Sequence, residues 1–493
     1  MRMNGLRRTI VAMFGAIFLV SSLPDIPAVA LTSQDRPAPQ HQPRPQPRPQ
    51  PRPQSRPGET PKSEDGKRRR PADGATGSRI RRNTKDRAVS ADSVISREFQ
   101  QQLIKQRLRA AKLIRRIEAR KTKESKRRSA EKKLQKKYGL AFVQEGNRRV
   151  LVRHGEIIGI NLSDEAKSAL EEMGFRMQRQ TVLSAIGLTM DLMLVPRGMA
   201  MKDALAAVKN TDQKSYFGYN VAYAPSGFKA AGMAYSVTEK AIPLSAKKNT
   251  ADRAKKPEPA AVVGMIDTGV NAAHEAFEGA KILQGNMGRG ERVTPRDHGT
   301  AVASILARHP DTRIVAVDVF SGPAAYADAE SIVLALEFLA MSNVGVINMS
   351  IAGPANPLLK TAVGNLIKRG HIIVAAVGNE GPAGPDRFPA AQGNVVGVTA
   401  VDAMNIIFEH ANRGRAVDYA AVGVEIDAAS VLGRKQYSGT SFAAPVVSAF
   451  LAHQLKKPDV GAVSKAMVLL NSTVTDIGAV GPDPVFGLGL LEY

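Results

Sequence analysis

From residue 258 to residue 493 the sequence predicts an α/β fold, in which a parallel sheet carries helices on both faces. Continuous apolar runs indicate parallel strands that are buried on both faces: AAVVGMI, RIVAVDV, GVINMS, HIIVAAVG and NVVGVTAV. Helical stretches lie between them, including AVASILARH, DAESIVLALEFLAMS and PLLKTAVGNLIKRG. In such a fold, functional side chains gather at the carboxyl ends of the strands.

The segment 148–224 predicts a smaller α+β unit in front of this fold. Its elements follow the order β-α-β-β-α-β, which is the split βαβ arrangement. Ser163 opens a helix in SDEAKSALEEMG that Gly174 ends, and alternating Leu and Met residues mark LTMDLMLV as a strand. Residues 225–257, rich in Ala, Lys and Ser, are predicted to form an exposed linker.

The first 30 residues have the pattern of a signal peptide. Three arginines precede the apolar stretch 9–23, and a small-x-small cleavage site follows it at Ala28-Val29-Ala30. The apolar stretch is shorter than the roughly 20 residues that a membrane-spanning helix needs, although an uncleaved anchor is the alternative interpretation. Cleavage near Ala30 predicts a mature protein that is secreted or held in the periplasm or cell envelope.

A basic arm, residues 31–137, carries almost all of the net charge of +24, because it holds 32 Lys/Arg and 11 Asp/Glu. Residues 31–96, which include the Pro-Arg-Pro-Gln repeat of residues 43–54, are predicted to be disordered, whereas residues 97–147 are predicted to be a basic helical segment. Two interpretations stay equally open: adhesion to an anionic cell-envelope surface, or a solvated spacer. No nucleic-acid partner is expected, because export separates the arm from the genome and no aromatic stacking residues accompany the charge.

The composition limits the chemistry. With 493 residues the chain is long enough for two or three domains. It contains no cysteine, which excludes disulfides, thiolate nucleophiles and cysteine-ligated metal centres.

Three residue types that together perform nucleophilic catalysis lie at predicted junctions of the sheet. Asp267 follows an apolar strand, His298 lies in RDHGTAVASIL before a helix, and Ser441 lies in SGTSFAAPVV at the start of another. A serine hydroxyl needs a base within hydrogen-bond reach, and an imidazole needs a carboxylate that fixes its tautomer. The sequence therefore predicts a triad of Asp267, His298 and Ser441.

Two donors are predicted for an oxyanion. Asn379 follows the buried strand in HIIVAAVGNEGP, and its amide is one donor. The backbone N–H of Ser441, at a helix start, is the other. Pro445 is expected to be tolerated because it falls in the first turn of that helix.

The four motifs MIDTGV, DHGTAVA, AAVGNEG and SGTSFAAP, in the order Asp, His, Asn, Ser, resemble those of the subtilisin-like serine peptidases, or subtilases. The resemblance covers about residues 257–493 and implies the subtilisin-like fold and peptide-bond hydrolysis. It implies that Asp267, His298 and Ser441 are catalytic and that Asn379 holds the oxyanion. It also implies a set of substrate-binding residues: Ser350, Ile351, Ala352, Gly353, Ala375, Ala376 and Gly378.

Some positions depart from the family pattern. Ala301 stands where a second histidine is frequent, Phe442 replaces the common methionine after the nucleophile, and Ala352 replaces a glycine, which affects the substrate pocket. No cofactor is expected: many relatives bind calcium, but no acidic cluster in this sequence identifies a calcium site.

The resemblance further implies that residues 148–224 are a pro-domain, a folding assistant whose C-terminal end occupies the substrate cleft. Self-cleavage is then expected within residues 225–257. The predicted protein is an exported, self-inhibited serine endopeptidase that acts on proteins or peptides and binds its own pro-domain. The alternatives are a catalytically inactive subtilase-like binding or chaperone module, and an anionic-surface-binding protein that acts through the basic arm.

Overall fold

The computed structural model describes residues 124–493 apart from 147, 213–214, 226–259, 310 and 323–325. The predicted signal peptide, the Pro/Arg-rich segment 31–96 and residues 226–257 of the predicted linker lie outside the described residues. In the described part of the chain, no helix is both long enough and apolar enough to cross a bilayer.

The basic helical segment ends earlier than the sequence predicted. A helix covers residues 124–138, but residues Leu140–Glu145 form strand β1 where helix was expected up to residue 147. Gly139 adopts a φ of 64°, and its N–H donates to the carbonyl of Gln135, which ends the helix in a left-handed turn. Leu140 and Val143 are then buried, so the apolar residues of this stretch serve a strand that pairs with β2.

The small α+β unit has the predicted element order. Its strands are β2 (Arg148–Ile160), β3 (Arg176–Leu183), β4 (Leu188–Leu194) and β5 (Tyr216–Pro225). Helix α2 (Asp164–Glu172) connects β2 to β3, and α3 (Met201–Thr211) connects β4 to β5. The strands pair antiparallel in the order β5-β2-β4-β3. As predicted, Ser163 caps α2, because its hydroxyl accepts from the N–H of Ala166.

The rest of the chain is built on an eight-stranded parallel sheet in the order β17-β14-β13-β12-β10-β6-β8-β7. Five strands match the predicted apolar runs: β6 (Ala261–Asp267), β8 (Thr312–Asp318), β10 (Val346–Met349), β12 (Ile372–Ala376) and β13 (Val396–Val401). Three further strands were not predicted: β7 (Lys281–Asn286), β14 (Tyr419–Val422) and β17 (Leu490–Leu491). They are short or lie at an edge, so they lack a long apolar run.

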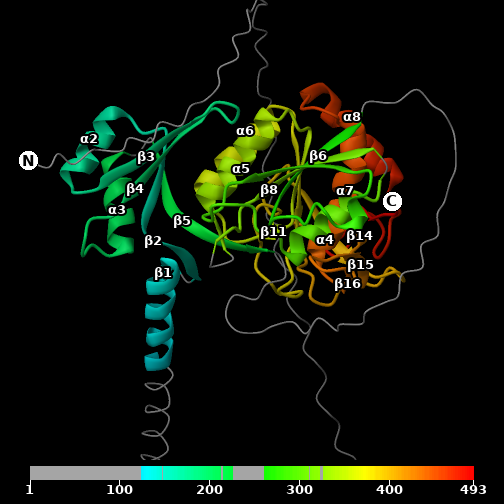
Figure 1. Ribbon diagram of the computed structural model, residues 1–493, viewed down its shortest axis with the longest axis horizontal. Helices are drawn as coiled ribbons and strands as arrows, with labels where there is room; N and C mark the ends of the chain where they lie inside the picture. Colours follow the sequence, from blue (N-terminus) through cyan, green and yellow to red (C-terminus); the bar gives the residue numbers. More distant parts are fainter. Residues whose placement is uncertain (1–123, 147, 213–214, 226–259, 310, 323–325) are drawn as a thin grey trace, which may run out of the picture. The chain divides into compact units, whose positions relative to one another are not determined.

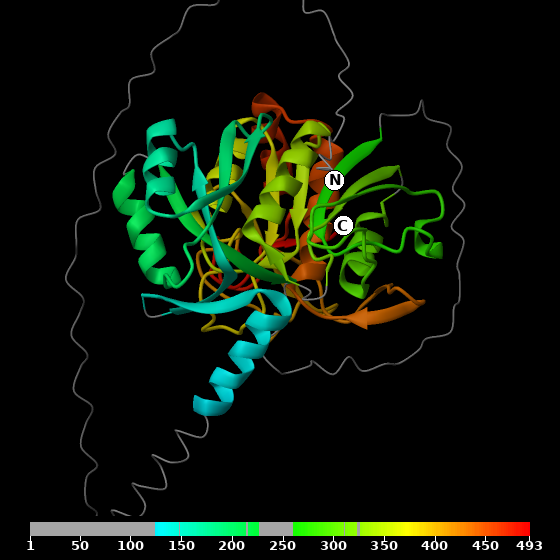
Figure 2. The same cartoon turned by 60° about the vertical axis from the view of Figure 1, so that its left-hand side comes forward.

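Helices cover both faces of this sheet, as predicted (Figures 1 and 2). One face carries α5 (Ala329–Met341) and α6 (Pro357–Lys368), and the other carries α4 (Asp297–Leu306), α7 (Thr440–Gln454) and α8 (Val460–Thr473). Short elements complete the fold: η1 (Glu275–Phe277), β9 (Ala327–Asp328), β11 (Ile351–Ala352), and a hairpin of β15 (Ile426–Ala429) and β16 (Arg434–Tyr437).

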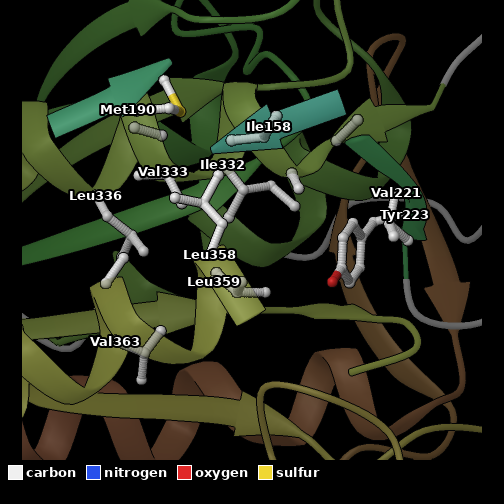
Figure 3. Close-up of a cluster of buried hydrophobic side chains, with 14 of the residues drawn as sticks. Ile158, Met190, Val221, Tyr223, Ile332, Val333, Leu336, Leu358, Leu359 and Val363 are labelled. Carbon is white, nitrogen blue, oxygen red and sulfur yellow. The ribbon is translucent and has the colours of Figure 1, made fainter. Parts of the chain in front are cut away.

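The small unit packs its sheet on the α5 and α6 face. Side chains of both parts form one buried hydrophobic cluster, which Figure 3 shows with Ile158, Met190 and Val221 on one side and Ile332, Leu336 and Leu358 on the other. Burial of apolar surface contributes about 25 cal/mol per Å². The cluster therefore holds the two parts together without a covalent link other than the chain.

Strand β5 reaches beyond the small sheet into the larger part of the molecule. Its end pairs antiparallel with β11, where Pro225 faces Ile351 and Ala224 faces Ala352. The preceding residues of β5 pair antiparallel with β9. The last strand of the small unit thus lies along the segment that the sequence predicted to bind substrate.

Candidate active site

Asp267 and His298 form a hydrogen-bonded pair at the carboxyl end of β6. Asp267 is the last residue of the strand and fully buried, and its Oδ1 lies 2.8 Å from His298 Nδ1. Since a carboxylate accepts, Nδ1 carries the hydrogen and Nε2 is the basic nitrogen of the imidazole. Among the described residues, Nε2 has no hydrogen-bond partner. The pair therefore presents a base held in one tautomer.

Gly299 allows His298 to come this close. A Cβ atom on Gly299 would lie 2.2 Å from the carbonyl oxygen of Thr268, which is far inside van der Waals contact. The Gly299 N–H instead donates to the Thr268 hydroxyl at 2.8 Å. The start of α4 is thereby fixed against the turn that follows β6, and His298, the second residue of α4, is brought to Asp267.

Ser441 is the second residue of α7 and fully buried. Gly439, the residue before the helix, has a φ of 152°, which residues with a side chain rarely adopt, and a Cβ there would lie 3.1 Å from the amide nitrogen of Asn379, so glycine is favoured. The Ser441 hydroxyl donates to the carbonyl of Ser350 at 3.4 Å. Its backbone N–H belongs to the first turn of α7, where N–H groups have no partner within the helix.

The explanation that the sequence suggested for Pro445 is wrong. Because α7 begins at Thr440, Pro445 is the sixth residue of the helix and lies beyond its first turn. A residue with an N–H at this position would donate to the carbonyl of Ser441. That carbonyl instead accepts from the hydroxyl of Ser350 at 2.8 Å. The proline is tolerated because Ser350, from the loop after β10, replaces the missing donor.

Asn379 lies beside the start of α7, and Thr440 fixes the orientation of its side-chain amide. Its Oδ1 accepts both from the Thr440 N–H and from the Thr440 hydroxyl, each at 3.0 Å. The donor end, Nδ2, is therefore directed away from Thr440. Thr440 was not among the predicted site residues. It is adjacent to Ser441 in the sequence, but no spacing of residues indicates that it holds Asn379.

Phe442 lies against the imidazole. Its ring centroid is 5.4 Å from that of His298 and 5.0 Å from that of Tyr437. The residue that departs from the family pattern thus contacts the base as well as filling space behind the serine. Ala301, the second departure, is fully buried in α4.

The predicted substrate-binding residues divide into two groups. Ile351 and Ala352 form β11 and pair with β5, and the N–H of Gly353 donates to the carbonyl of Phe388 at 3.0 Å. A Cβ on Gly353 would meet the ring of Tyr223 at 2.1 Å, so glycine is needed for this ring to pack.

The second group lies at the end of β12 and just after it. Ala375 and Ala376 are fully buried within β12. Gly378, with a φ of 108°, donates its N–H to the Thr440 hydroxyl at 3.3 Å. Their role as the opposing wall of a pocket stays a prediction.

The described residues hold no group of three or more His, Asp or Glu side chains arranged as a metal site. Calcium binding stays an expectation from the resemblance alone.

Comparison with known proteins agrees with the motifs. Residues 259–489 match the model of the subtilase family, peptidase family S8. The chain is 31% identical over 215 residues to the major intracellular serine protease of Bacillus subtilis. The matched region covers 38% of this chain and 66%, just under two thirds, of that relative. The chain is 31% identical over 238 residues to subtilisin DY of Bacillus licheniformis, covering 44% of this chain and 84% of the relative.

Among solved structures, the prenylagaramide maturation protease PagA is 26% identical, with a TM-score of 0.42, over 48% of this chain and 91% of that chain. The identity to subtilisin DY extends over most of that relative's length. Together with the family match to the region of the parallel sheet, it identifies the chain as a member of the subtilase family of serine peptidases.

Proposed function

We propose that the chain is an exported serine endopeptidase, made as a precursor that is inhibited and processed by itself. The observation that carries the peptidase activity is the 2.8 Å contact between Asp267 Oδ1 and His298 Nδ1, in a family of serine peptidases. This contact leaves Nε2 of His298 as a base. His298 lies at the same edge of the sheet as Ser441, which is at the start of a helix.

In the proposed mechanism Ser441 Oγ attacks the peptide carbonyl carbon while His298 Nε2 takes the hydroxyl proton. His298 then gives this proton to the leaving amine as the C–N bond breaks, and an acyl ester remains on Ser441. Water, deprotonated by His298, hydrolyses the ester and restores the serine. Asp267 orients the imidazole and stabilises its charged form throughout.

The negative charge on the carbonyl oxygen develops beside two donors. Nδ2 of Asn379 is one, and the backbone N–H of Ser441 is the other, supported by the positive end of the α7 dipole. Thr440 supports this arrangement by fixing the opposite end of the Asn379 amide.

Self-inhibition is supported by the pairing of β5 with β9 and β11. A substrate that binds as an added strand needs the same edges, because backbone hydrogen bonds to a sheet edge are how extended peptides are held. The last strand of the small unit therefore acts as an occupant of the cleft. Processing is expected after this strand, within residues 225–257.

Two further parts of the proposal concern segments that lie wholly or mostly outside the described residues. The segment 1–30 is proposed to direct export and to be removed near Ala30. The basic arm is proposed to bind anionic cell-envelope surfaces. Deleting residues 31–137 should leave peptide hydrolysis unchanged and weaken binding to anionic vesicles at low salt. Unchanged vesicle binding would identify the arm as a spacer.

A fluorophosphonate probe tests the peptidase. It should label the processed protein at Ser441, and the Ser441→Ala variant should not be labelled. The same variant should accumulate as a precursor that retains residues 148–257. A processed wild-type protein that takes up no probe would instead identify an inactive binding or chaperone module. Normal processing of Ser441→Ala would assign the cleavage to another protease.

A further inference from the structure

Six charged side chains gather where the small unit meets the N-terminal end of α5. We call this group the ionic cluster: Arg153, Glu156, Arg179, Arg289, Asp328 and Glu330. Three of them belong to the small unit and three to the peptidase part. None of them lies among the residues of the proposed triad or oxyanion site.

Asp328 is the fully buried centre of the ionic cluster. Its Oδ2 accepts from Arg153 Nε and from Arg289 Nε, each at 2.9 Å, and its Oδ1 accepts from the Ser331 N–H as the cap of α5. Burial by itself raises the pKa of this carboxyl, but Arg289 and Arg153 hold the pKa below its usual value. Asp328 therefore remains ionised and requires cations around it.

Glu330, the second residue of α5, is 2% exposed and lies two residues after Asp328 in the same cluster. It pairs with Arg179 of the small unit and accepts from Arg289 at 3.0 Å. Burial raises the pKa of Glu330 above its usual value despite these partners. Arg289 also pairs with Glu156 of the small unit at 3.0 Å.

The charges balance only when the small unit is present. With it, three guanidinium groups meet three carboxylates. Without it, Arg153, Arg179 and Glu156 are lost, and the peptidase part keeps the two carboxylates of Asp328 and Glu330 with the single cation of Arg289. Two carboxylates beside one guanidinium leave a net negative charge, so this end of α5 then attracts a cation.

The site lies beside the path of an extended peptide. In β5, Ala222 is paired with Asp328 itself, and Asn220 is two residues earlier. The Asn220 side chain is buried and reaches the cluster: its Oδ1 accepts from the Glu330 N–H at 3.2 Å and its amide donates to Glu156 at 2.7 Å. A side chain at this strand position thus points at the end of α5.

We propose that Asp328 and Glu330 bind a basic side chain, arginine or lysine, of the substrate at the strand position of Asn220. This position is five residues before the one that pairs with Ile351. In the precursor an asparagine suffices there, because Arg153 reaches Asp328 from the neighbouring strand β2. The inference rests on the proposed endopeptidase activity and on the proposed removal of the small unit. It adds a preference for a basic substrate side chain at a position remote from the cleaved bond.

Competition by short peptides tests the proposal on the mature enzyme that the full-length chain yields. Three peptides carry the sequence of residues 216–232, with asparagine, arginine or glutamate at position 220, and each competes with casein for the enzyme. The arginine peptide should inhibit casein hydrolysis with a Ki about tenfold lower than the asparagine peptide, the size of one charge-assisted pair. The glutamate peptide should be the weakest, and the difference between peptides should shrink at high salt.

A variant assigns the effect to the two carboxylates. In Asp328→Asn combined with Glu330→Gln, the arginine and asparagine peptides should inhibit equally. Glu409→Gln, which removes an exposed carboxylate whose side chain is 81% exposed, should keep the preference of the parent enzyme. The three peptides test the proposal on the parent enzyme alone if the double variant does not fold.

The outcomes separate the two proposals. Equal inhibition by the three peptides, in an enzyme that hydrolyses casein, overturns the cation site and leaves the endopeptidase proposal standing. A preference for arginine that survives in the double variant also overturns it, because other carboxylates would then be responsible. Absence of casein hydrolysis overturns the endopeptidase proposal and the cation site together.

Discussion

His298 and Asn379 are each positioned by a neighbouring residue that takes no part in the proposed chemistry. Thr268 holds the residue after His298, Thr440 holds Asn379, and glycine at 299 permits an approach that a Cβ would block. The geometry of the proposed triad is therefore set by residues that take no part in proton transfer. Substitutions that separate these two roles are the most informative.

Asn379→Asp removes the hydrogen-bond donor of Asn379 and keeps the oxygen that contacts Thr440. Aspartate keeps an oxygen for the Thr440 N–H but has no amide hydrogen for the oxyanion. We expect kcat to fall about 10²- to 10³-fold, with a smaller change in KM and an almost unchanged melting temperature. Steady-state kinetics and calorimetry measure both. A large loss of thermal stability would mean that Asn379 mainly supports α7.

Asp318→Asn tests a buried carboxyl next to Asp267 in the sheet register. Burial raises the pKa of Asp318 above the usual 3.8, although it accepts from the N–H groups of Thr294 and Phe320. The ionised form is thus disfavoured in the folded state, so the free energy of unfolding of the parent decreases as pH rises from 3.8 through the raised pKa. We expect asparagine to destabilise less at pH 7 than at pH 4, in urea unfolding of the Ser441→Ala precursor. An equal or opposite difference would contradict this sign.

Helix α7 carries a proline in its second turn, and a side chain from another element compensates for it. The carbonyl of Ser441 is left without an N–H donor by Pro445 and accepts from Ser350 instead. Ser350 also accepts from Asn348 at 3.0 Å, so the end of β10 is tied to the start of α7. The helix of the proposed nucleophile and the predicted substrate-binding segment are thus one hydrogen-bonded unit.

A double-mutant cycle measures this coupling. Ser350→Ala leaves a buried carbonyl without its donor and should cost about 1–3 kcal/mol of unfolding free energy. Pro445→Ala supplies an N–H to the same carbonyl, so Ser350→Ala should cost measurably less in that background. Denaturant unfolding of the Ser441→Ala precursor, whose backbone carbonyl is retained, gives the four values. Additive effects would show that the two residues do not share this carbonyl.

The contacts that join the two parts of the molecule include the apolar face of α5 and α6, the ionic cluster, and the strand pairing of β5. Tyr223 belongs to the last of these. It is 1% exposed, packs on Gly353 and donates its hydroxyl to the carbonyl of Pro354 at 2.9 Å. The end of β5 is thus anchored by an aromatic side chain beside the proposed active site.

Tyr223→Ala should weaken the attachment of β5. Loss of a buried aromatic side chain costs about 3 kcal/mol or more, so the Ser441→Ala precursor should melt several degrees lower. In the catalytically intact chain, inhibition by the small unit should weaken. Tyr216→Ala, at the exposed start of the same strand, is the matched control and should change little. Equal effects of the two substitutions would mean that Tyr223 is not an anchor.

The sequence by itself determined the features that depend on neighbouring residues. The five apolar runs, the β-α-β-β-α-β order and the helix cap at Ser163 follow from local periodicity and side-chain chemistry, and the structure has them. The four motifs identified the family because their order and residue types are specific. The position of Asp267 at a strand end was also predictable, because the apolar run stops there.

Tertiary structure decided the contacts between residues far apart in the chain. Ser350 and Ser441 are separated by 91 positions, and Arg153 and Asp328 by 175. No local pattern pairs such residues, because their meeting depends on how two whole surfaces fit. The same reason explains the error at Pro445: its position relative to Ser441 was known, but the donor that makes it acceptable comes from the loop after another strand. The ionic cluster likewise exists only because the small sheet is docked on α5.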